Sequence, residues 1–270
     1  ERILGVLIMR PHFAAFALLL AMAFQAGCGA GVQQIKKDER QKAREAAARY
    51  ENASWQVRRA AVRELAGFKG REVEDLLLRA LDDSHSLVRI EALRSLEGTE
   101  SGKARRRIRA LAEYEPNVNV RWQAIRVLGG FRDARDSVVF AKGLSSDDWL
   151  IREESIKGLL AIEDFAIRYV SIPYILQALE DPNINVKLAA IEHLTIRDER
   201  IYKALASMLD DDSSTRHTLL KALLKALAGY RLDGLTLKRV SALLVHQNAE
   251  IRVLALRLLK RDRELRKNGD

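Results

Sequence analysis

The chain has 270 residues, of which 48% are hydrophobic and 31% are charged, so it is long and apolar enough to bury a substantial core. This composition excludes a disordered chain, because disorder requires low hydrophobicity together with high net charge. A single cysteine excludes an internal disulfide framework and a cysteine-rich zinc site. The net charge of +9 allows an anionic partner, and the abundance of Ala, Leu, Arg and Glu favours helices.

The first 27 residues have the pattern of a secretion signal. Residues 13–24 are apolar and uncharged, which is the length of a signal-peptide core and too short for a comfortable membrane-spanning helix. A short basic segment from Met9 to His12 precedes this run and indicates that translation starts at Met9. We therefore predict a signal peptide over residues 1–27.

The only cysteine, Cys28, follows the apolar run directly, after Gln25-Ala26-Gly27. This arrangement resembles the lipobox of bacterial lipoproteins, in which small residues precede a cysteine that is lipidated and becomes the mature N-terminus. The resemblance implies lipidation of Cys28, a short tether over residues 28–35, and attachment to the periplasmic face of a membrane in the bacterial cell envelope. Gly29 is not an inner-membrane retention signal of the Asp type, which favours the outer membrane where one is present. Ordinary secretion and a retained N-terminal helix are the alternatives.

A repeat of roughly 31 residues runs through the rest of the chain. Residues 57–65 and 88–96 match position for position, and further nine-residue copies begin at residues 120, 151, 186, 215 and 251. Position 2 of each copy is Arg or Lys, position 6 is aliphatic and position 9 is Leu. Because the apolar positions 1, 5, 6 and 9 share one side of a helix, each copy predicts an amphipathic helix.

The start of each copy carries a helix-initiation signal. The residues three positions before the copies are Ser54, His85, Asn117, Asp148, Asn183, Asp212 and Asn248, and all except His85 are common N-cap residues. Between copies the spacing predicts a second set of helices at 72–81, 105–112, 172–179 and 202–209. Turns are expected at Gly67, Gly70, Gly98, Gly102, Gly129 and Gly130. Each repeat is therefore an antiparallel helix pair, and stacked pairs form a solenoid.

The pattern Val-Arg-x-x-Ala-x-x-x-Leu resembles HEAT repeats, in particular the short type of phycobilisome-lyase-like proteins, over residues 36–262. The resemblance implies an all-α fold: a right-handed α-solenoid of about seven helix pairs, whose second helices, which carry the nine-residue copies, line the concave side. Residues 263–270 would form a basic tail. The resemblance also implies that the position-2 cations are structural and pair with acidic loop residues such as Asp83, Asp147 and Asp181. These cations are Arg58, Arg89, Arg121, Arg152, Lys187, Arg216 and Arg252.

Position 7 of the copies lies off the apolar stripe and is basic in six of the seven copies, the exception being Glu192. Stacking would align these cations along one surface, which predicts a site for an acidic protein or another anionic partner; a merely solvated surface is the alternative. The predicted partner-binding residues are Arg63, Arg94, Trp122, Arg126, Lys157, Lys221 and Arg257. A separate basic cluster over residues 103–109 is expected to contact lipid head groups or an acidic partner, or to be a solvated face.

Catalytic patterns are not found in the sequence: the histidines lack metal-ligand spacing, and there is no phosphate-binding loop or nucleophile elbow. We therefore expect no enzymatic activity, no cofactor, no metal and no small-molecule substrate. The sequence predicts a lipid-anchored envelope scaffold that binds another protein. One alternative is a basic solenoid that binds nucleic acid, although a secretion signal argues against it. The other is a lyase-like accessory protein, which the family resemblance prompts.

Overall fold

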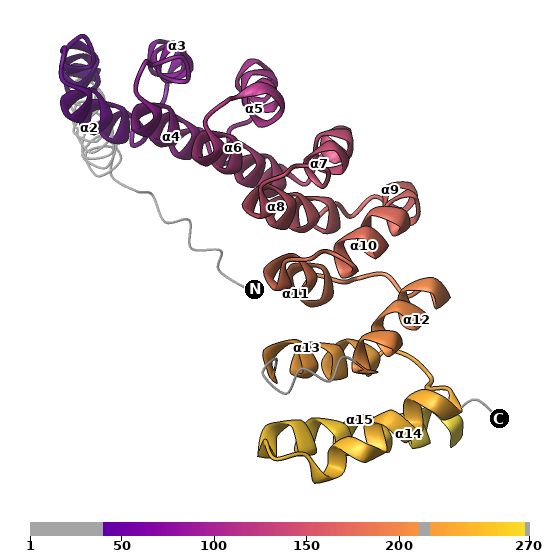
Figure 1. Ribbon diagram of the computed structural model, residues 1–270. Coiled ribbons are helices and arrows are strands. Elements are labelled where there is room, and N and C mark those ends of the chain that lie inside the picture. Colours follow the sequence, from indigo (N-terminus) through magenta and orange to yellow (C-terminus); the bar gives the residue numbers. More distant parts are fainter. Residues whose placement is uncertain (1–39, 211–216, 268–270) are drawn as a thin grey trace, which may run out of the picture. The chain divides into compact units, whose positions relative to one another are not determined.

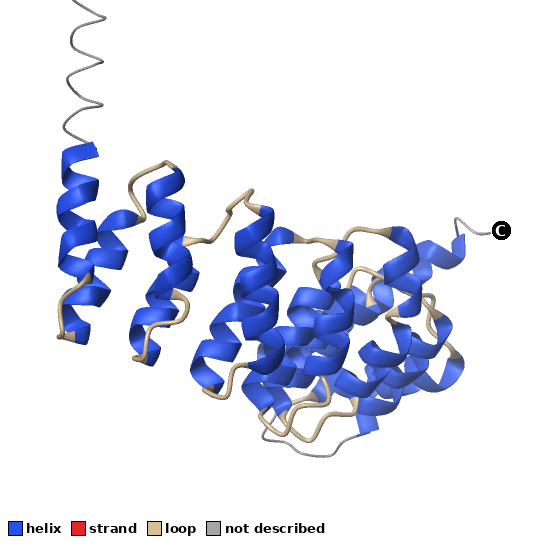
Figure 2. Cartoon of the chain, turned by 90° about the horizontal axis from the view of Figure 1, so that it is seen from above, coloured by secondary structure: helices blue, strands red, loops and turns tan. Residues whose placement is uncertain are grey.

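The computed structural model describes residues 40–210 and 217–267, and these residues form helices, short 3-10 turns and loops without any β-strand (Figures 1 and 2). The expected all-α fold of repeated helix pairs is confirmed. The chain divides into two compact units, residues 1–77 and 78–270, which we describe separately. The predicted signal peptide, Cys28, the tether, Asp212 and Arg216 lie outside the described residues.

The first unit contains a helix over residues 40–50, helix α2 (Trp55–Leu65) and the start of helix α3 (Arg71–Ala80). Helix α2 buries Ala61, Val62 and Leu65, which are positions 5, 6 and 9 of the first copy. The predicted apolar stripe of this copy is therefore confirmed. Gly70, with a φ of 134°, forms the turn just before α3.

The second unit contains the remaining helix pairs. Its second helices are α4 (Ser86–Ser95), α6 (Val118–Phe131), α8 (Trp149–Leu160), α11 (Ile184–Glu192), α13 (His217–Leu227) and α15 (Ala249–Lys267). Its first helices are α5 (Gly102–Tyr114), α7 (Ser137–Gly143), α9 (Phe165–Val170) with α10 (Ile172–Leu179), α12 (Glu199–Ser207) and α14 (Gly234–Ala242). Short 3-10 turns are found at Ala134–Asp136, Met208–Asp210 and Leu243–Val245.

The second helices of this unit pack in series, α4 on α6, α6 on α8, α8 on α11, α11 on α13 and α13 on α15. The helices α6, α8, α11, α13 and α15 also pack on first helices, as α5 does on α6 and α7 on α8. Figure 1 shows the second helices of this unit on the inner side of its curve and the first helices on the outer side. Packing against neighbouring helices explains why the apolar positions are buried in α4, at Val88, Ala92, Leu93 and Leu96, whereas Leu256 at position 6 of the last copy is 46% exposed.

Three expectations about helix ends are wrong. Gly129 and Gly130 lie within α6, which continues to Phe131 and ends at Arg132, whose φ of 51° is left-handed. Gly102 is the first residue of α5 and not part of the turn before it. Residues 263–267 continue α15 instead of starting a tail, and Arg266 pairs there with the buried Asp262.

The predicted N-caps are largely confirmed. The Asn117 side chain accepts hydrogen bonds from the amides of Asn119 and Val120, and those of Asp148, Asn183 and Asn248 cap their helices similarly. His85, which is not a typical cap residue, also caps, because its ring nitrogen accepts from the amide of Leu87. Ser54 makes no capping hydrogen bond, and its hydroxyl group bonds to Gln56 instead.

Candidate functional site

The position-2 arginines hold the turn that precedes their own helix. Arg89 donates from Nη1 to the carbonyl oxygens of Asp83 and Ser84, at 2.8 and 3.3 Å. Arg152 donates to the equivalent carbonyls of Ser146 and Asp147 at 2.8 and 3.0 Å. The same bonds connect Arg58 with Asn52 and Ala53, Arg121 with Glu115, and Arg252 with His246 and Gln247. This recurrence supports a structural role for the position-2 cations.

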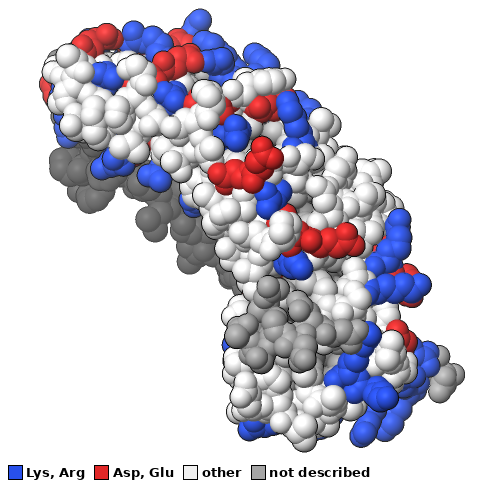
Figure 3. Space-filling model, viewed as in Figure 1, with Lys and Arg blue, Asp and Glu red and all other residues white. Residues whose placement is uncertain are grey.

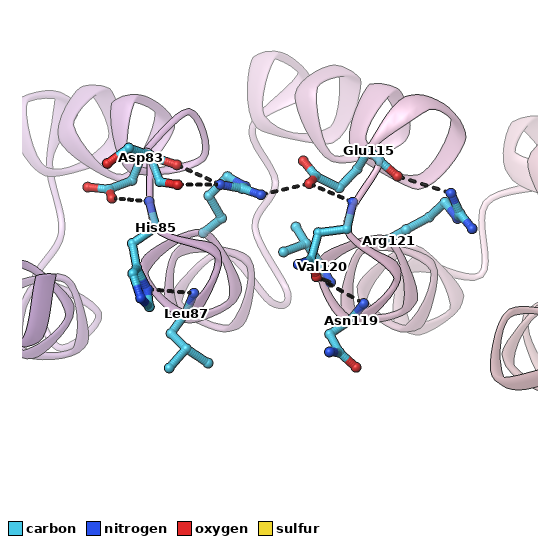
Figure 4. A network of polar contacts seen from close by, with 10 residues as sticks. Asp83, His85, Leu87, Glu115, Asn119, Val120 and Arg121 are labelled. Carbon is cyan, nitrogen blue, oxygen red and sulfur yellow. Dashed lines mark hydrogen bonds and ion pairs between the residues drawn. The ribbon is translucent and has the colours of Figure 1, made fainter. Parts of the chain in front are cut away.

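Arg89 and Arg152 also connect to the following repeat. Arg89 Nη2 lies 2.7 Å from Glu115 Oε1, so its partner is a residue that the sequence did not indicate. Figure 4 shows Glu115 in the turn before α6, where its backbone carbonyl also accepts from Arg121. Arg152 makes a bidentate pair with Asp181, at 2.7 and 3.0 Å, as expected. Within the described residues Arg121 has no carboxylate partner of this kind, and Ser146 occupies the corresponding place in the turn before α8. For Asp147 the observed bond uses the carbonyl oxygen and not the carboxylate.

The Arg152–Asp181 pair illustrates that these cations make contacts within the fold. Burial raises the pKa of Asp181, but the hydrogen bonds from Arg152 and from the amide of Asn183 outweigh it, so the pKa lies below its usual value of 3.8. Both side chains are largely buried, at 14% and 7% exposed. Such arginines are not available to a binding partner.

The basic cluster over residues 103–109 is also largely used within the protein. Arg107 pairs with Asp82, and Arg109 Nε lies 2.6 Å from Asp136, which is buried. Arg105 pairs with Asp133 at 3.7 Å and lies over the ring of Phe131. Three of the five cations therefore stabilise the contacts of α5 with its neighbours, which makes this cluster a poor candidate for an external ligand.

The cations at position 7 differ from those at position 2 in their exposure and their contacts. Arg94 on α4 and Arg126 on α6 are exposed, and the guanidinium carbon of Arg126 lies 5.7 Å from the ring centroid of Trp122, within cation–π range. Lys157 on α8 pairs with Glu153 at 2.5 Å and approaches Glu154 at 3.9 Å. The structure thus brings Arg94, Trp122, Arg126 and Lys157 onto three successive second helices.

The other predicted residues lie elsewhere. Lys221 on α13 pairs with Glu250 at 2.9 Å, and Arg257 is exposed on α15. Arg63 is exposed on α2 in the first unit. The position-7 cations are therefore not one continuous, unpaired row, and acidic and basic side chains are intermingled in the view of Figure 3.

Position 4 of the copies contains functional candidates that the sequence analysis missed. It is Glu91, Gln123 and Glu154 in three successive copies, where most others have Ala, Thr or Leu. Glu91 and Gln123 are buried, at 6% and 2% exposed. This run of polar residues at one repeat position was the available signal. We call Glu91, Arg94, Trp122, Gln123, Arg126, Glu154 and Lys157 the second-helix row.

Positions 7 and 4 meet across neighbouring repeats. Arg94 Nε lies 3.4 Å from Gln123 Oε1, so position 7 of one repeat faces position 4 of the next. Arg126 and Glu154 hold the same two repeat positions in the next pair of copies, and the positive charge of Arg126 acts on the Glu154 carboxyl group. Burial raises the pKa of Glu154, although the positive charges of Lys157 and Arg126 oppose the increase. The row is therefore a set of neighbouring polar side chains along α4, α6 and α8, in which Arg94 and Arg126 are exposed and Glu91 and Gln123 are buried. The Glu154 carboxylate lies in an environment that disfavours its charge.

The remaining described residues give no indication of a metal or of a membrane span. No group of three or more His, Cys, Asp or Glu side chains within residues 40–210 and 217–267 is arranged to hold a metal ion. Over the same part of the chain, no helix combines the length and apolar character needed to cross a bilayer.

Comparison with known proteins identifies the repeat. Residues 43–114 match the family model of HEAT repeats. The structure is similar to the archaeal HEAT-like repeats protein from Thermococcus onnurineus NA1, with a TM-score of 0.51 and 17% identity over 84% of this chain and 97% of that chain. It is also similar to the complex of CpcE and CpcF of phycocyanin lyase from Nostoc sp. PCC7120, with a TM-score of 0.48 and 23% identity over 82% and 93%. No curated protein matches the sequence. Residues 43–114 are thus similar to HEAT repeats, and the chain has a HEAT-like repeat fold.

Proposed function

We propose that the protein is a lipid-anchored scaffold of the bacterial cell envelope, and that it binds another protein through the second-helix row. The observation that carries this proposal is the run of Glu91, Gln123 and Glu154 at one repeat position. Burying a polar side chain costs free energy unless it is hydrogen-bonded, and other copies fold with Ala60 or Ala189 at the same position. The repeat itself therefore does not require these polar side chains, which makes a binding role a reason for their presence.

The exposed members of the row favour an acidic protein segment as the partner. Arg94 and Arg126 are exposed, and Trp122 supplies aromatic surface beside Arg126. Arg and Trp are the side chains that contribute most to protein–protein binding energy. Lys157 contributes less positive charge, because Glu153 and Glu154 already neutralise it. In this proposal the protein has no catalytic role of its own and needs no cofactor.

Reversing the two exposed charges tests the binding surface. We expect Arg94→Glu/Arg126→Glu to reduce capture of the partner from envelope extract at least tenfold. The matched control is Arg106→Glu/Lys238→Glu, because these side chains are exposed on α5 and α14 and form no ion pair within the described residues. Equal losses in both variants, or no loss in either, would contradict the proposal. Capture of nucleic acid instead, with an affinity that falls steeply with salt, would support the alternative function.

The lipid anchor has a separate test. Mass spectrometry of the N-terminal peptide of the native protein should find a peptide that begins at Cys28 and carries acyl mass. An N-terminal peptide that retains residues 9–27 and carries no lipid would refute the anchor. This result would leave the binding surface on α4, α6 and α8 open to its own test.

A further inference from the structure

The first unit contains a cavity of about 520 Å³ close to the beginning of the described chain. The helix over residues 40–50 contributes Arg40, Ala43 and Arg44, the turn between α2 and α3 contributes residues 68–70, and the first turn of α3 contributes residues 71–73. Its volume lies within the range of roughly 300–1,000 Å³ that is common for ligand sites. The second-helix row has no part in it.

The cavity is strongly basic. It is lined by four cations, Arg40, Arg44, Lys69 and Arg71, and by a single carboxylate, that of Glu72. Arg71 lies 3.9 Å from Asp75 in an exposed pair, and the other three cations form no ion pair within the described part of the chain. This differs from the second unit, where Arg89, Arg109 and Arg152 are all paired with carboxylates.

The backbone adds hydrogen-bond donors to this charge. Helix α3 begins at Arg71, and the residue before it is Gly70, which has no side chain to cap the first amides. Free amides and the positive end of the helix dipole favour an anion at this position. The negative charges of Glu72 and Glu74 in the first turn oppose this effect in part, so it is the four cations that make the net charge of the site positive.

We infer that this cavity binds the phosphate head groups of anionic phospholipids. The inference rests on the proposed lipid anchor, because Cys28 precedes Arg40 by only twelve residues. A chain of that length spans at most about 40 Å when fully extended, so an acylated Cys28 keeps the cavity within reach of the bilayer surface. Basic residues next to a lipid anchor strengthen attachment to anionic membranes, and stable anchoring generally requires two such signals.

Lipid binding to the mature protein in a neutral detergent tests the site, with native mass spectrometry as the readout. We expect phosphatidylglycerol to bind and phosphatidylcholine not to bind. Arg44→Glu/Lys69→Glu should weaken phosphatidylglycerol binding at least tenfold, whereas Arg106→Glu/Lys238→Glu should leave it unchanged. If the first variant fails to fold by circular dichroism, Arg44→Gln/Lys69→Gln takes its place. Equal binding of both lipids, or unchanged phosphatidylglycerol binding in the cavity variant, would overturn the inference.

A competition experiment separates the two sources of phosphate. Inorganic phosphate that displaces phosphatidylglycerol at equimolar concentration would make the cavity a site for free phosphate and would overturn the lipid assignment. The test is also distinct from that of the anchor, because the lipid is added and its binding does not require acylation of Cys28. If a protein with an acylated Cys28 does not bind phosphatidylglycerol, only the inference that the cavity binds lipid head groups is refuted, and the lipid anchor is not.

Discussion

Gly158 on α8 is expected to be one of the least replaceable residues of the second unit. A Cβ atom added there would lie 2.5, 2.7 and 2.9 Å from three ring carbons of Phe140 on α7. Phe140 is fully buried, and because protein interiors are close-packed we expect its ring to yield only at a cost in free energy. Gly158 also faces Gly129 on α6, where an added Cβ would lie 3.3 Å from the Gly158 Cα. The two glycines thus allow α6 and α8 to approach closely and bring their parts of the second-helix row together.

We expect Gly158→Ala to destabilise the protein by about 1–2 kcal/mol. Overpacking a core costs roughly 1–3 kcal/mol, and the better helix propensity of Ala returns up to about 1 kcal/mol. Gly130→Ala is the matched control, because Gly130 lies in α6 with no atom within 4 Å of an added Cβ. This control should stabilise the protein by about 0.5–1 kcal/mol. Urea unfolding followed by circular dichroism measures both, and an equal effect of the two substitutions would refute the packing argument.

Three further predictions test the polar contacts. Arg152→Lys should lower the free energy of unfolding by about 1–2 kcal/mol more than Arg121→Lys, because of these two arginines only Arg152 makes a bidentate pair with a buried carboxylate of the next repeat. Equal decreases in urea unfolding would contradict this. Glu154→Gln should raise the melting temperature at pH 7, because burial raises the pKa of this carboxyl group and its ionised form therefore destabilises the folded state. This increase in melting temperature should disappear as the pH falls to 4.5, the ordinary pKa of Glu, because the carboxyl group is then increasingly protonated in the folded and the unfolded state. An increase that does not depend on pH would contradict this explanation. Asn117→Ala should lower the free energy of unfolding by about 1 kcal/mol and Ser54→Ala by only about 0.3 kcal/mol, because the Asn117 side chain caps two amides and that of Ser54 caps none. Similar decreases for the two substitutions would disprove the cap assignment.

Local signals explain which parts of the fold were predictable. The second helices follow from apolar spacing within nine residues, and their starts follow from single cap residues such as Asn117 and Asp148. Gly129 was wrongly expected in a turn, because its local preference is overridden by close packing against Gly158, 29 residues away. Packing between repeats is a tertiary effect that single-residue propensities do not contain.

The candidate site was predictable only in part, for the same reason. Position 7 is visible in the sequence as a row of cations, but its neutralisation at Lys221 depends on Glu250 in the following repeat. The contact of Arg94 with Gln123 likewise joins residues 29 positions apart. A repeat alignment shows which positions recur, whereas the structure is needed to show that position 7 meets position 4 of the next repeat. The lipid anchor at Cys28 stays a prediction.

Site-specific photo-crosslinking in the native envelope tests most directly whether the second-helix row is the partner-binding surface. A benzophenone side chain replaces Trp122 in one variant and the exposed Val138 of the outer helix α7 in another. We expect one defined protein adduct from position 122, its loss after Arg94→Glu/Arg126→Glu, and no such adduct from position 138. An adduct from position 138 alone, or an adduct at position 122 that survives the charge reversal, would contradict this account of the protein.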